Sequence, residues 1–216
     1  FAVRFNFVDF PTERKNHVGN IPLIGGICIF LGALISYIFF IEFNKFFNIL
    51  LFTASLILIQ GVWDDFKNLK AKTKMAFQAL LCVIMIYITD LKLDSFGNIL
   101  GISESIELGI LSIPVTIIAV VGLTNAINMI DGLDGFASSV VLIAIFGMLG
   151  FSLSSEISSF KKILLAIAST LVPFMIFNIT SYPKMKIFLG DGGSLFLGFI
   201  ISFTLIYCAE NDNSFN

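Results

Sequence analysis

Residues 110–150 read ILSIPVTIIAVVGLTNAINMIDGLDGFASSVVLIAIFGMLG, and this stretch indicates how the chain folds. The apolar run on each side approaches the ~20 residues that a helix needs to cross a bilayer. The polar centre, spaced by three and interrupted by glycine, consists of Asn125, Asn128, Asp131 and Asp134. Polar side chains without partners are costly at membrane depth. The pattern therefore predicts two membrane-spanning helices whose polar connection has a role beyond packing.

The overall composition is that of an integral membrane protein. Of the 216 residues, 57% are hydrophobic and 13% are charged, and the mean hydropathy is +0.96. A soluble domain has about 25% charged residues. The net charge of −2 provides no basic patch, so nucleic acid is not expected as a partner.

Cysteine and histidine usage argues against zinc and against a disulfide framework. Cys28, Cys82 and Cys208 lie singly within apolar runs, and His17 is the one histidine of the sequence. Structural zinc sites need clustered Cys and His ligands. We interpret the cysteines as small hydrophobic residues buried in the membrane.

The apolar runs predict an all-α integral membrane fold, a helical bundle of about 7 spans. A count of six or eight is compatible with the shorter runs. One polytopic domain over 1–216 is expected, and it is expected to be incomplete because the chain starts at Phe1 and stops soon after an apolar run. The predicted spans are 21–41, 46–63, 75–90, 108–127, 136–153, 161–178 and 193–209.

Basic residues predict the orientation, because lysine and arginine are enriched in cytoplasmic loops. With the N-terminal segment in the cytoplasm, nine of the 13 basic residues fall on that side. The longest external segment, 90–107, alternates apolar and polar residues around Gly97-Asn98, which predicts a small external β-hairpin and the only strands of the chain. The nine cytoplasmic residues are Arg4, Arg14, Lys15, Lys67, Lys70, Lys72, Lys74, Lys184 and Lys186.

With this orientation, four polar stretches meet at one membrane surface although whole spans separate them in the sequence. Such convergence at helix ends is the pattern expected of a functional site. The four stretches are 8–26, 61–78, 122–139 and 186–198.

Asp64 and Asp65 end one apolar run directly. Adjacent carboxylates repel each other, so the pair implies a compensating cation. Taken alone, the pair is better explained as a solvated loop at the membrane edge. Lys74 and Gln78, one turn apart on the next helix, can face the aspartates, and Lys74 could bind phosphate as a point charge. Lysine at this position is equally typical of membrane anchoring.

The polar connection of residues 125–134 would place its four side chains on one stripe of a helix. Oxygen ligands of this kind suit Mg²⁺, which takes a few carboxylates together with substrate phosphates. The alternative is a polar helix end capped by Asn and Asp side chains. Gly132 and Gly135 weaken the helix here, so the backbone is expected to open near the membrane surface.

Two further sequence features are weaker indications of a functional site. The glycine-rich segment GDGGS (190–194) could direct backbone N–H groups at an anion while Asp191 offers a carboxylate to a metal, although a plain loop before a helix would look the same. Gly190, Gly192 and Ser194 are candidate substrate-binding residues on this interpretation. His17, in the charged segment before the first span, is also a candidate, with an interfacial histidine as the alternative.

Together these motifs resemble the polyprenyl-phosphate N-acetylhexosamine-1-phosphate transferase family (glycosyltransferase family 4). The family includes WecA/TagO-type initiators of surface polysaccharides and MraY-type enzymes of peptidoglycan synthesis. The resemblance covers nearly the whole chain, in the order of the family. The pattern DxPxERKxHxGxIPxxGG matches Asp9 to Gly26, the Asp-Asp motif matches Asp64, Asp65, Lys74 and Gln78, NAxNxxDGLDG matches Asn125 to Gly135, and GDxGSxxLG matches Gly190 to Gly198.

The resemblance implies an Mg²⁺-dependent transferase (with Mn²⁺ as a substitute) at the cytoplasmic face of a bacterial inner membrane. The phosphate of undecaprenyl phosphate would attack the β-phosphate of a UDP-sugar, releasing UMP, and the first candidate donor is UDP-GlcNAc. By position, Asn128 and Asp191 match metal-contacting residues. Asp64, with Asp65 beside it, matches the carboxylate that activates or positions the lipid phosphate. Lys74 matches a phosphate-contacting lysine, and Asn125, Asp131 and Asp134 would complete the nucleotide-sugar and metal environment.

The chain also departs from the family. A complete member has about 10–11 spans and a histidine-rich cytoplasmic loop near its C-terminus. Residues 1–216 contain neither the full number of spans nor that loop. The resemblance therefore implies a fragment without the first span and the C-terminal spans. It is also compatible with a homodimer.

Three alternatives stay open from the sequence. The first is an MraY-type phospho-MurNAc-pentapeptide transferase, although the IDGLDG form favours the WecA/TagO-like group. The second is a membrane transporter that binds a cation, because intramembrane ionisable residues often line ion pathways. The carboxylates cluster at one membrane face, and no inverted repeat is visible, which disfavours a transporter. The third is a non-catalytic membrane scaffold.

Overall fold

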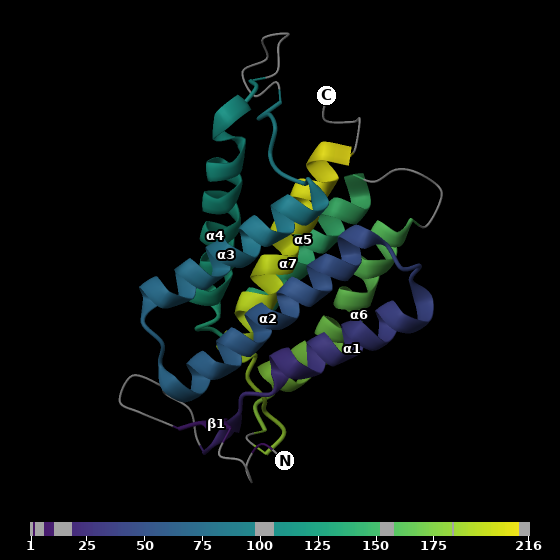
Figure 1. Cartoon of the computed structure of the whole chain (residues 1–216). Helices are drawn as coiled ribbons and strands as arrows, with labels where there is room; N and C mark the ends of the chain where they lie inside the picture. Colours follow the sequence, from purple (N-terminus) through teal and green to yellow (C-terminus); the bar gives the residue numbers. More distant parts are fainter. Residues whose placement is uncertain are drawn as a thin grey trace.

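The structure is a computed structural model, and it is a bundle of α-helices with a small sheet at one end (Figure 1). His17 and Asn98 lie outside the described residues, so the histidine prediction and the tip of the predicted hairpin stay predictions. The structure describes residues 2, 7–10, 19–97, 106–151, 158–182 and 184–211.

Each of the seven predicted spans is confirmed as a helix in the described part of the chain. Five of the helices are long and apolar enough to cross a membrane, and α1 and α5 are shorter apolar helices. Many large apolar side chains on the outside of the bundle are exposed, as in a protein that faces lipid. The helices are α1 (Gly25–Phe40), α2 (Lys45–Lys67), α3 (Ala71–Thr89), α4 (Ser112–Ile130, preceded by the 3-10 turn Gly109–Leu111), α5 (Phe136–Phe151), α6 (Ser159–Ile179) and α7 (Gly190–Asn211).

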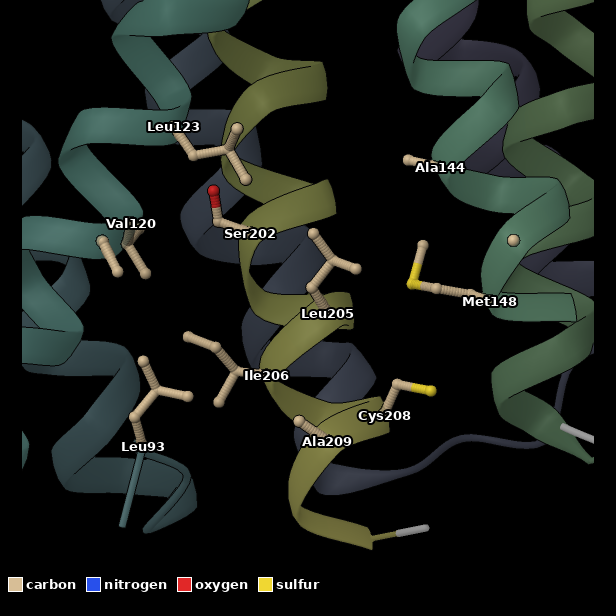
Figure 2. Close-up of a pocket in the computed structure, with 12 residues that line it drawn as sticks. Leu93, Val120, Leu123, Ala144, Met148, Ser202, Leu205, Ile206, Cys208 and Ala209 are labelled. Carbon is tan, nitrogen blue, oxygen red and sulfur yellow. The ribbon is translucent and has the colours of Figure 1, made fainter. Parts of the chain in front are cut away.

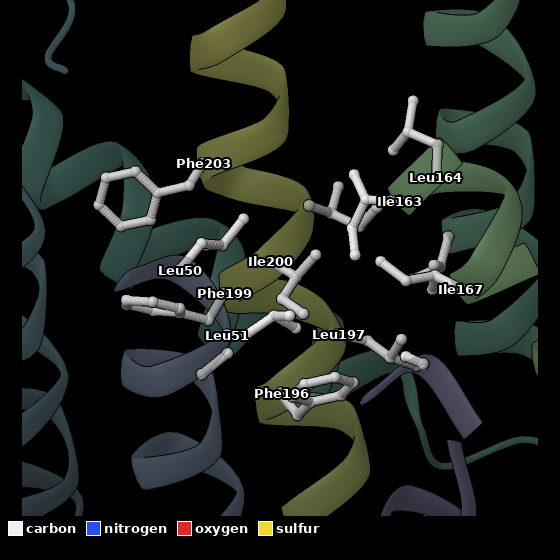
Figure 3. Packing of buried hydrophobic residues seen from close by; sticks show 14 of the residues in the cluster. Leu50, Leu51, Ile163, Leu164, Ile167, Phe196, Leu197, Phe199, Ile200 and Phe203 are labelled. Carbon is white, nitrogen blue, oxygen red and sulfur yellow. The ribbon is translucent and has the colours of Figure 1, made fainter. Parts of the chain in front are cut away.

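Helix α7 lies at the centre of the bundle and packs against α1, α2, α4 and α5. Its side chains are almost entirely buried along most of its length, which explains why it is apolar on every side. Phe196, Phe199 and Phe203 are fully buried, and Figure 3 shows Phe199 and Phe203 beside Leu50 of α2, with Ile163 and other residues of α6 on the opposite side of α7. The position of α7 therefore determines where the ends of its neighbours meet.

The structure contains a two-stranded sheet that the sequence did not predict. Strands β1 (Val8–Asp9) and β2 (Ile21–Pro22) pair antiparallel, so the prediction that residues 90–107 contain the only strands was wrong. Within the predicted hairpin of residues 90–107, Ser95 and Glu107 form one antiparallel bridge.

Two helix boundaries differ from the prediction. The prediction ended the second span before the aspartate pair, but α2 continues through Asp64 and Asp65 to Lys67. The GDGGS segment is not a loop, because it forms the first turn of α7 from Gly190 onward. Both boundaries move carboxylates from connecting segments onto rigid helices.

Glycine permits the close approach of α7 to α1 and α2. A Cβ atom on Gly61 of α2 would lie 2.5 Å from the Cα of Gly192 and 2.6 Å from the carbonyl oxygen of Asp191. A Cβ atom on Gly26 of α1 would lie 2.3 Å from the Cα of Gly193. No real Cβ tolerates such distances, so the backbones can meet only where side chains are absent.

The two ends of the bundle differ in chemistry. The polar segments before α1, between α2 and α3, between α4 and α5, and before α7 all lie at the end that carries β1 (Figure 1). Toward the other end, an apolar hollow of about 550 Å³ lies between α4, α5 and α7, where Val120, Met148 and Leu205 line it (Figure 2). The polar segments and the apolar hollow thus lie toward opposite ends of the described bundle.

The glycine contact predicts a difference between two Gly→Ala variants. Gly61→Ala should destabilise the protein by about 1–3 kcal/mol because its methyl group overlaps the α7 backbone. Gly122→Ala, in α4, should be neutral or stabilise slightly, since nothing lies within 4 Å of its added Cβ and alanine favours helix. Thermal unfolding of the purified protein in detergent measures both, and equal shifts in Tm would contradict the packing argument.

Candidate functional site

A cavity of about 650 Å³ opens at the polar end of the bundle. Carboxylates dominate its wall, and they come from β1, α2, the turn after α4 and the start of α7. The cavity thus collects residues that are up to 182 positions apart, from position 9 to position 191. The acidic residues of the wall are Asp9, Asp64, Asp65, Asp131, Asp134 and Asp191, and Asn128 and Lys186 are also part of it.

Asp64 connects α2 to α3. Its carboxylate accepts a hydrogen bond of 2.6 Å from the backbone N–H of Leu69 and forms an ion pair with the ammonium group of Lys74. The Asp64 side chain is 3% exposed and that of Lys74 is 17% exposed, so the pair is largely shielded from solvent. Asn68 makes the tight turn between the two helices in the left-handed conformation, which asparagine tolerates well. Lys74 therefore faces the aspartates, as its helical position predicted.

Asp65 caps the beginning of α7 from another helix. Its carboxylate accepts hydrogen bonds from the backbone N–H groups of Asp191 (3.0 Å) and Gly192 (3.4 Å). The first N–H groups of a helix have no partner within the helix, and a negative charge there also interacts favourably with the helix dipole. Gly190 has φ +75°, and a Cβ atom there would lie 2.9 Å from the Asp65 carboxylate. Glycine thus makes room for the cap.

This cap changes the interpretation of the glycine-rich segment. The sequence suggested that its N–H groups face a bound anion. In the structure, those of Asp191 and Gly192 already donate to Asp65. The hydroxyl of Ser194 donates to the carbonyl of Gly190 at 3.1 Å, so it too has an internal partner. Gly190 and Asp191 are the residues of the segment that line the cavity.

Asn128 connects α4 to the same helix start. Its amide group donates to the Asp191 carboxylate at 2.9 Å and to the Ser194 hydroxyl at 2.8 Å. The Asp191 carboxyl group is in turn a direct neighbour of the Asp64 carboxyl group. Two neighbouring carboxylates repel unless a proton or a cation lies between them. The metal candidates Asn128 and Asp191 are therefore brought together, with Asp64 beside them.

The predicted polar stripe is broken after its second member. Helix α4 ends at Ile130, so Asn125 and Asn128 are helical, whereas Asp131 and Asp134 lie in the turn that leads to Gly135. The predicted interruption of the helix near Gly132 and Gly135 is present. Asp131 still lines the cavity, where burial, together with the charges of Asp191, Asp65 and Asp134, raises the pKa of its carboxyl group to about 8. Asp134 is less buried and pairs with Lys186.

Asn125 lies away from the cavity wall. Its amide donates to the side-chain oxygen of Gln78 at 2.6 Å and to the carbonyl of Val121 at 2.7 Å. Gln78 is fully buried, so this contact joins α3 to α4 inside the bundle. A role for Asn125 in substrate binding stays a prediction.

Sequence reasoning missed Asn178, which holds two cavity segments together. Its side-chain oxygen accepts the N–H of Gly135 at 2.5 Å, and its amide donates to the carbonyl of Ile187 at 2.9 Å. It thereby joins the turn after α4 to the loop before α7. The available signal was a single asparagine near the end of an otherwise apolar run, at the same predicted membrane face. Asp9 and Lys186, which also line the cavity, belonged to the four polar stretches but were not candidates.

No group of three or more His, Cys, Asp or Glu side chains in the described residues is arranged to enclose a metal ion. The donors at the cavity are instead a few carboxylate and amide oxygens. The described donors at the cavity are thus oxygen atoms, not the sulfur and imidazole nitrogen atoms typical of structural zinc sites.

Comparison with known proteins gives consistent matches. The sequence profile of glycosyl transferase family 4 matches residues 47–209. A probable undecaprenyl-phosphate N-acetylglucosaminyl 1-phosphate transferase of Bacillus subtilis is 38% identical over 203 residues, which are 93% of this chain and 55% of that protein. The undecaprenyl-phosphate alpha-N-acetylglucosaminyl 1-phosphate transferase of Yersinia pestis is 32% identical over 213 residues, 98% of this chain and 58% of that protein.

The protein of the same name from Escherichia coli K12 is 30% identical over 207 residues, 95% of this chain and 56% of that protein. The chain thus spans somewhat more than half the length of these relatives. The family profile covers the helices that form the cavity, from α2 to α7. The chain belongs to glycosyl transferase family 4.

Proposed function

We propose that the protein transfers a sugar-1-phosphate, with GlcNAc-1-phosphate as the first candidate, from a UDP-sugar to undecaprenyl phosphate. The observation that supports this most directly is the meeting of Asp64, Asn128 and Asp191 at one cavity, from three different helices. The names of the relatives supply the substrate class. The product would be a lipid-diphosphate-sugar that starts a cell-envelope glycan, and UMP would be released.

The chemistry is phosphoryl transfer. An oxygen of the lipid phosphate forms a bond to the β-phosphorus of the donor, and the bond from that phosphorus to the oxygen bridging to the α-phosphate breaks. The electron pair leaves with UMP. Such reactions depend mostly on positioning and on neutralising the charge of the phosphates. The described side chains suit positioning, since they lie on helix ends that are held to one another.

The cavity residues fit Mg²⁺ as the cofactor, with Mn²⁺ as a substitute. Asp191 and Asn128 offer oxygen ligands, and Asp191, unlike its neighbour Asp64, forms no ion pair with a lysine among the described residues. Mg²⁺ often binds through one or two carboxylates and completes its coordination with water and substrate phosphates. A bound ion of this kind would neutralise charge on the diphosphate.

The remaining polar residues would position these groups. The Lys74 ammonium group holds the Asp64 carboxylate in place. The Asp64 carboxylate would in turn orient the lipid phosphate. Asp65 and Asn128 fix Asp191 from two sides, one through its backbone and the other through its side chain. Asp65 is thus proposed to act mainly by positioning Asp191, while Asp131 borders the space in which the donor would bind.

A cytoplasmic location of the site is supported by the distribution of lysines. Lys67, Lys70, Lys72, Lys74, Lys184 and Lys186 all lie at the cavity end of the bundle, next to the ends of α2 and α6 and the start of α3. Lys45, Lys92, Lys161 and Lys162 lie at the opposite helix ends. Since cytoplasmic segments are the more basic ones, the cavity would face the cytoplasm from the inner membrane.

Substituting Asp64→Asn or Asp191→Asn should reduce sugar-1-phosphate transfer at least about 100-fold, because each removes a charge at the reacting phosphates. Transfer would be measured with the intact protein in membranes, undecaprenyl phosphate, labelled UDP-GlcNAc and Mg²⁺, and omission of Mg²⁺ should have the same effect. Asp90→Asn is the matched control, since Asp90 caps α3 at the opposite end in a left-handed conformation that asparagine also adopts.

Unchanged transfer in both folded variants would contradict the site assignment. If no UDP-sugar supports transfer but the protein conducts cations in liposomes, the transporter interpretation would replace the enzyme.

Substitutions at Asp65 should separate positioning from direct chemistry. Asp65→Asn keeps an oxygen that can accept one of the two α7 N–H groups, whereas Asp65→Ala leaves both without a partner. We expect transfer to fall about 10-fold in Asp65→Asn and further in Asp65→Ala, with the Mg²⁺ concentration for half-maximal rate raised in both. Equal, complete loss of transfer at every Mg²⁺ concentration in both variants would indicate that the Asp65 charge itself takes part in the reaction.

The raised pKa of Asp131 predicts a dependence of stability on pH. The pKa is about 8 in the folded protein against an ordinary value of 3.8, so folding favours the protonated form. Its contribution to stability is fully present below the ordinary value and is lost as the pH rises through about 8. Without divalent cations, Tm should therefore fall by a few degrees between pH 6 and pH 9, and less in Asp131→Asn. An equal fall in both proteins would contradict this assignment.

A further inference from the structure

Lys186 projects from the loop between α6 and α7 into the cavity wall, and two contacts hold its ammonium group. It pairs with the Asp134 carboxylate, and it lies 5.6 Å from the centre of the Phe188 ring. The Lys186 side chain is 17% exposed, so most of its flexible stem is covered. Asp134 is 42% exposed and lies in the turn after α4. The ammonium group is thus fixed in place at the water-accessible edge of the cavity.

Lys186 is a cationic side chain in a cavity wall that is rich in aspartates. Six aspartates line the cavity, and Lys186 is the single lysine or arginine among the described residues of the wall. The other nearby ammonium group, that of Lys74, is paired with Asp64, which is 3% exposed, whereas Asp134, the partner of Lys186, is 42% exposed. A nucleotide diphosphate that enters this cavity adds further negative charge. A divalent ion beside Asp191 can offset part of it, and a second cation in the cavity wall would help to hold the diphosphate.

The ion pair of Lys186 with Asp134 is poorly explained by stability alone. Ion pairs with a half-exposed member contribute little to folding, because water screens them and two long side chains must be ordered. For the same reason the ammonium group can exchange part of its contact with Asp134 for a phosphate oxygen at low cost. A lysine that is already ordered also loses less conformational entropy when a ligand binds.

We propose that Lys186 binds the diphosphate of the nucleotide-sugar donor, and that Asp134 is the positioning residue that holds its ammonium group in the cavity. This inference rests on the function proposed above. The donor is the more suitable ligand because Lys186 and Asp134 belong to the segments that connect helices at the end of the bundle, where a soluble nucleotide enters. The lipid acceptor would instead approach from the bilayer, along the helices.

The test compares Lys186→Met with Lys184→Met in the intact protein. Lys184 lies two residues away in the same loop, is exposed and does not line the cavity, so it controls for the loss of one positive charge. Loss of a charge-assisted contact made in both ground and transition states should raise KM for UDP-GlcNAc about 10-fold and change kcat less than about 3-fold. Lys184→Met should behave as the wild type, and Lys186→Arg should retain most of the affinity.

A second measurement tests which part of the donor Lys186 contacts. In Lys186→Met, competitive inhibition by UDP should weaken about 10-fold, while inhibition by uridine should not change, since uridine has no phosphate. Lys186→Gln provides the same comparison if the methionine variant fails to fold. In the double variant Asp134→Asn/Lys186→Met, KM should be no higher than in Lys186→Met alone, because Asp134 is proposed to act through the lysine.

Several results would overturn the inference. Equal KM values for UDP-GlcNAc in Lys186→Met and Lys184→Met would overturn the inference. The proposed function would still stand in that case, provided that the wild-type protein catalyses transfer. A rise in KM confined to undecaprenyl phosphate would reject the donor as the ligand. An undiminished effect of Asp134→Asn on KM in the Lys186→Met background would reject the positioning role. Absence of transfer by the wild-type protein would overturn the proposed function and this inference together.

Discussion

The contact of the Asp65 carboxylate with the start of α7 is the constraint on which the rest of the site depends. It joins the last turn of α2 to the first turn of the central helix through two backbone hydrogen bonds. A buried helix start has N–H groups without partners, and leaving them so would cost about 1–3 kcal/mol each. Because the cap comes from the residue next to Asp64, the same contact that satisfies α7 places the Asp191 side chain beside Asp64. One interaction therefore links the packing of the central helix to the geometry of the site.

The cap works only because the backbones can approach. Gly61 lies against Gly192, Gly26 lies against Gly193, and Gly190 adopts a conformation that other residues rarely adopt. The glycines of GDGGS thus serve helix packing, whereas the sequence alone made them equally suitable as an anion-binding loop. The distinction matters for the chemistry, since N–H groups that already donate to Asp65 are not available to a phosphate. On the proposed function, recognition of phosphate would then depend on side chains and on a bound cation.

The sequence predicted the parts of the site that repeat a local pattern, and it was silent on those that depend on tertiary contact. The seven apolar runs correspond to seven helices. The position of Lys74 on the next helix predicted that it can face the aspartates, and it pairs with Asp64. It could not tell that Asn125 turns toward Gln78 while Asn128, one turn later, faces Asp191, because both choices satisfy the same spacing. Asn178 was missed for a similar reason, since its two partners lie in segments that meet only after folding.

The distribution of charge inside the cavity indicates where a cation is most needed. Asp64 is paired with Lys74, Asp134 with Lys186, and Asp65 with the positive end of a helix. Asp191 accepts a hydrogen bond from the neutral side-chain amide of Asn128. Burial and the negative charges of its neighbours raise the pKa of Asp131. Within the described residues, neither Asp191 nor Asp131 forms an ion pair with a lysine. The carboxyl groups that have no lysine partner are therefore concentrated between the turn after α4 and the start of α7, where a divalent ion and a diphosphate would together complete the site.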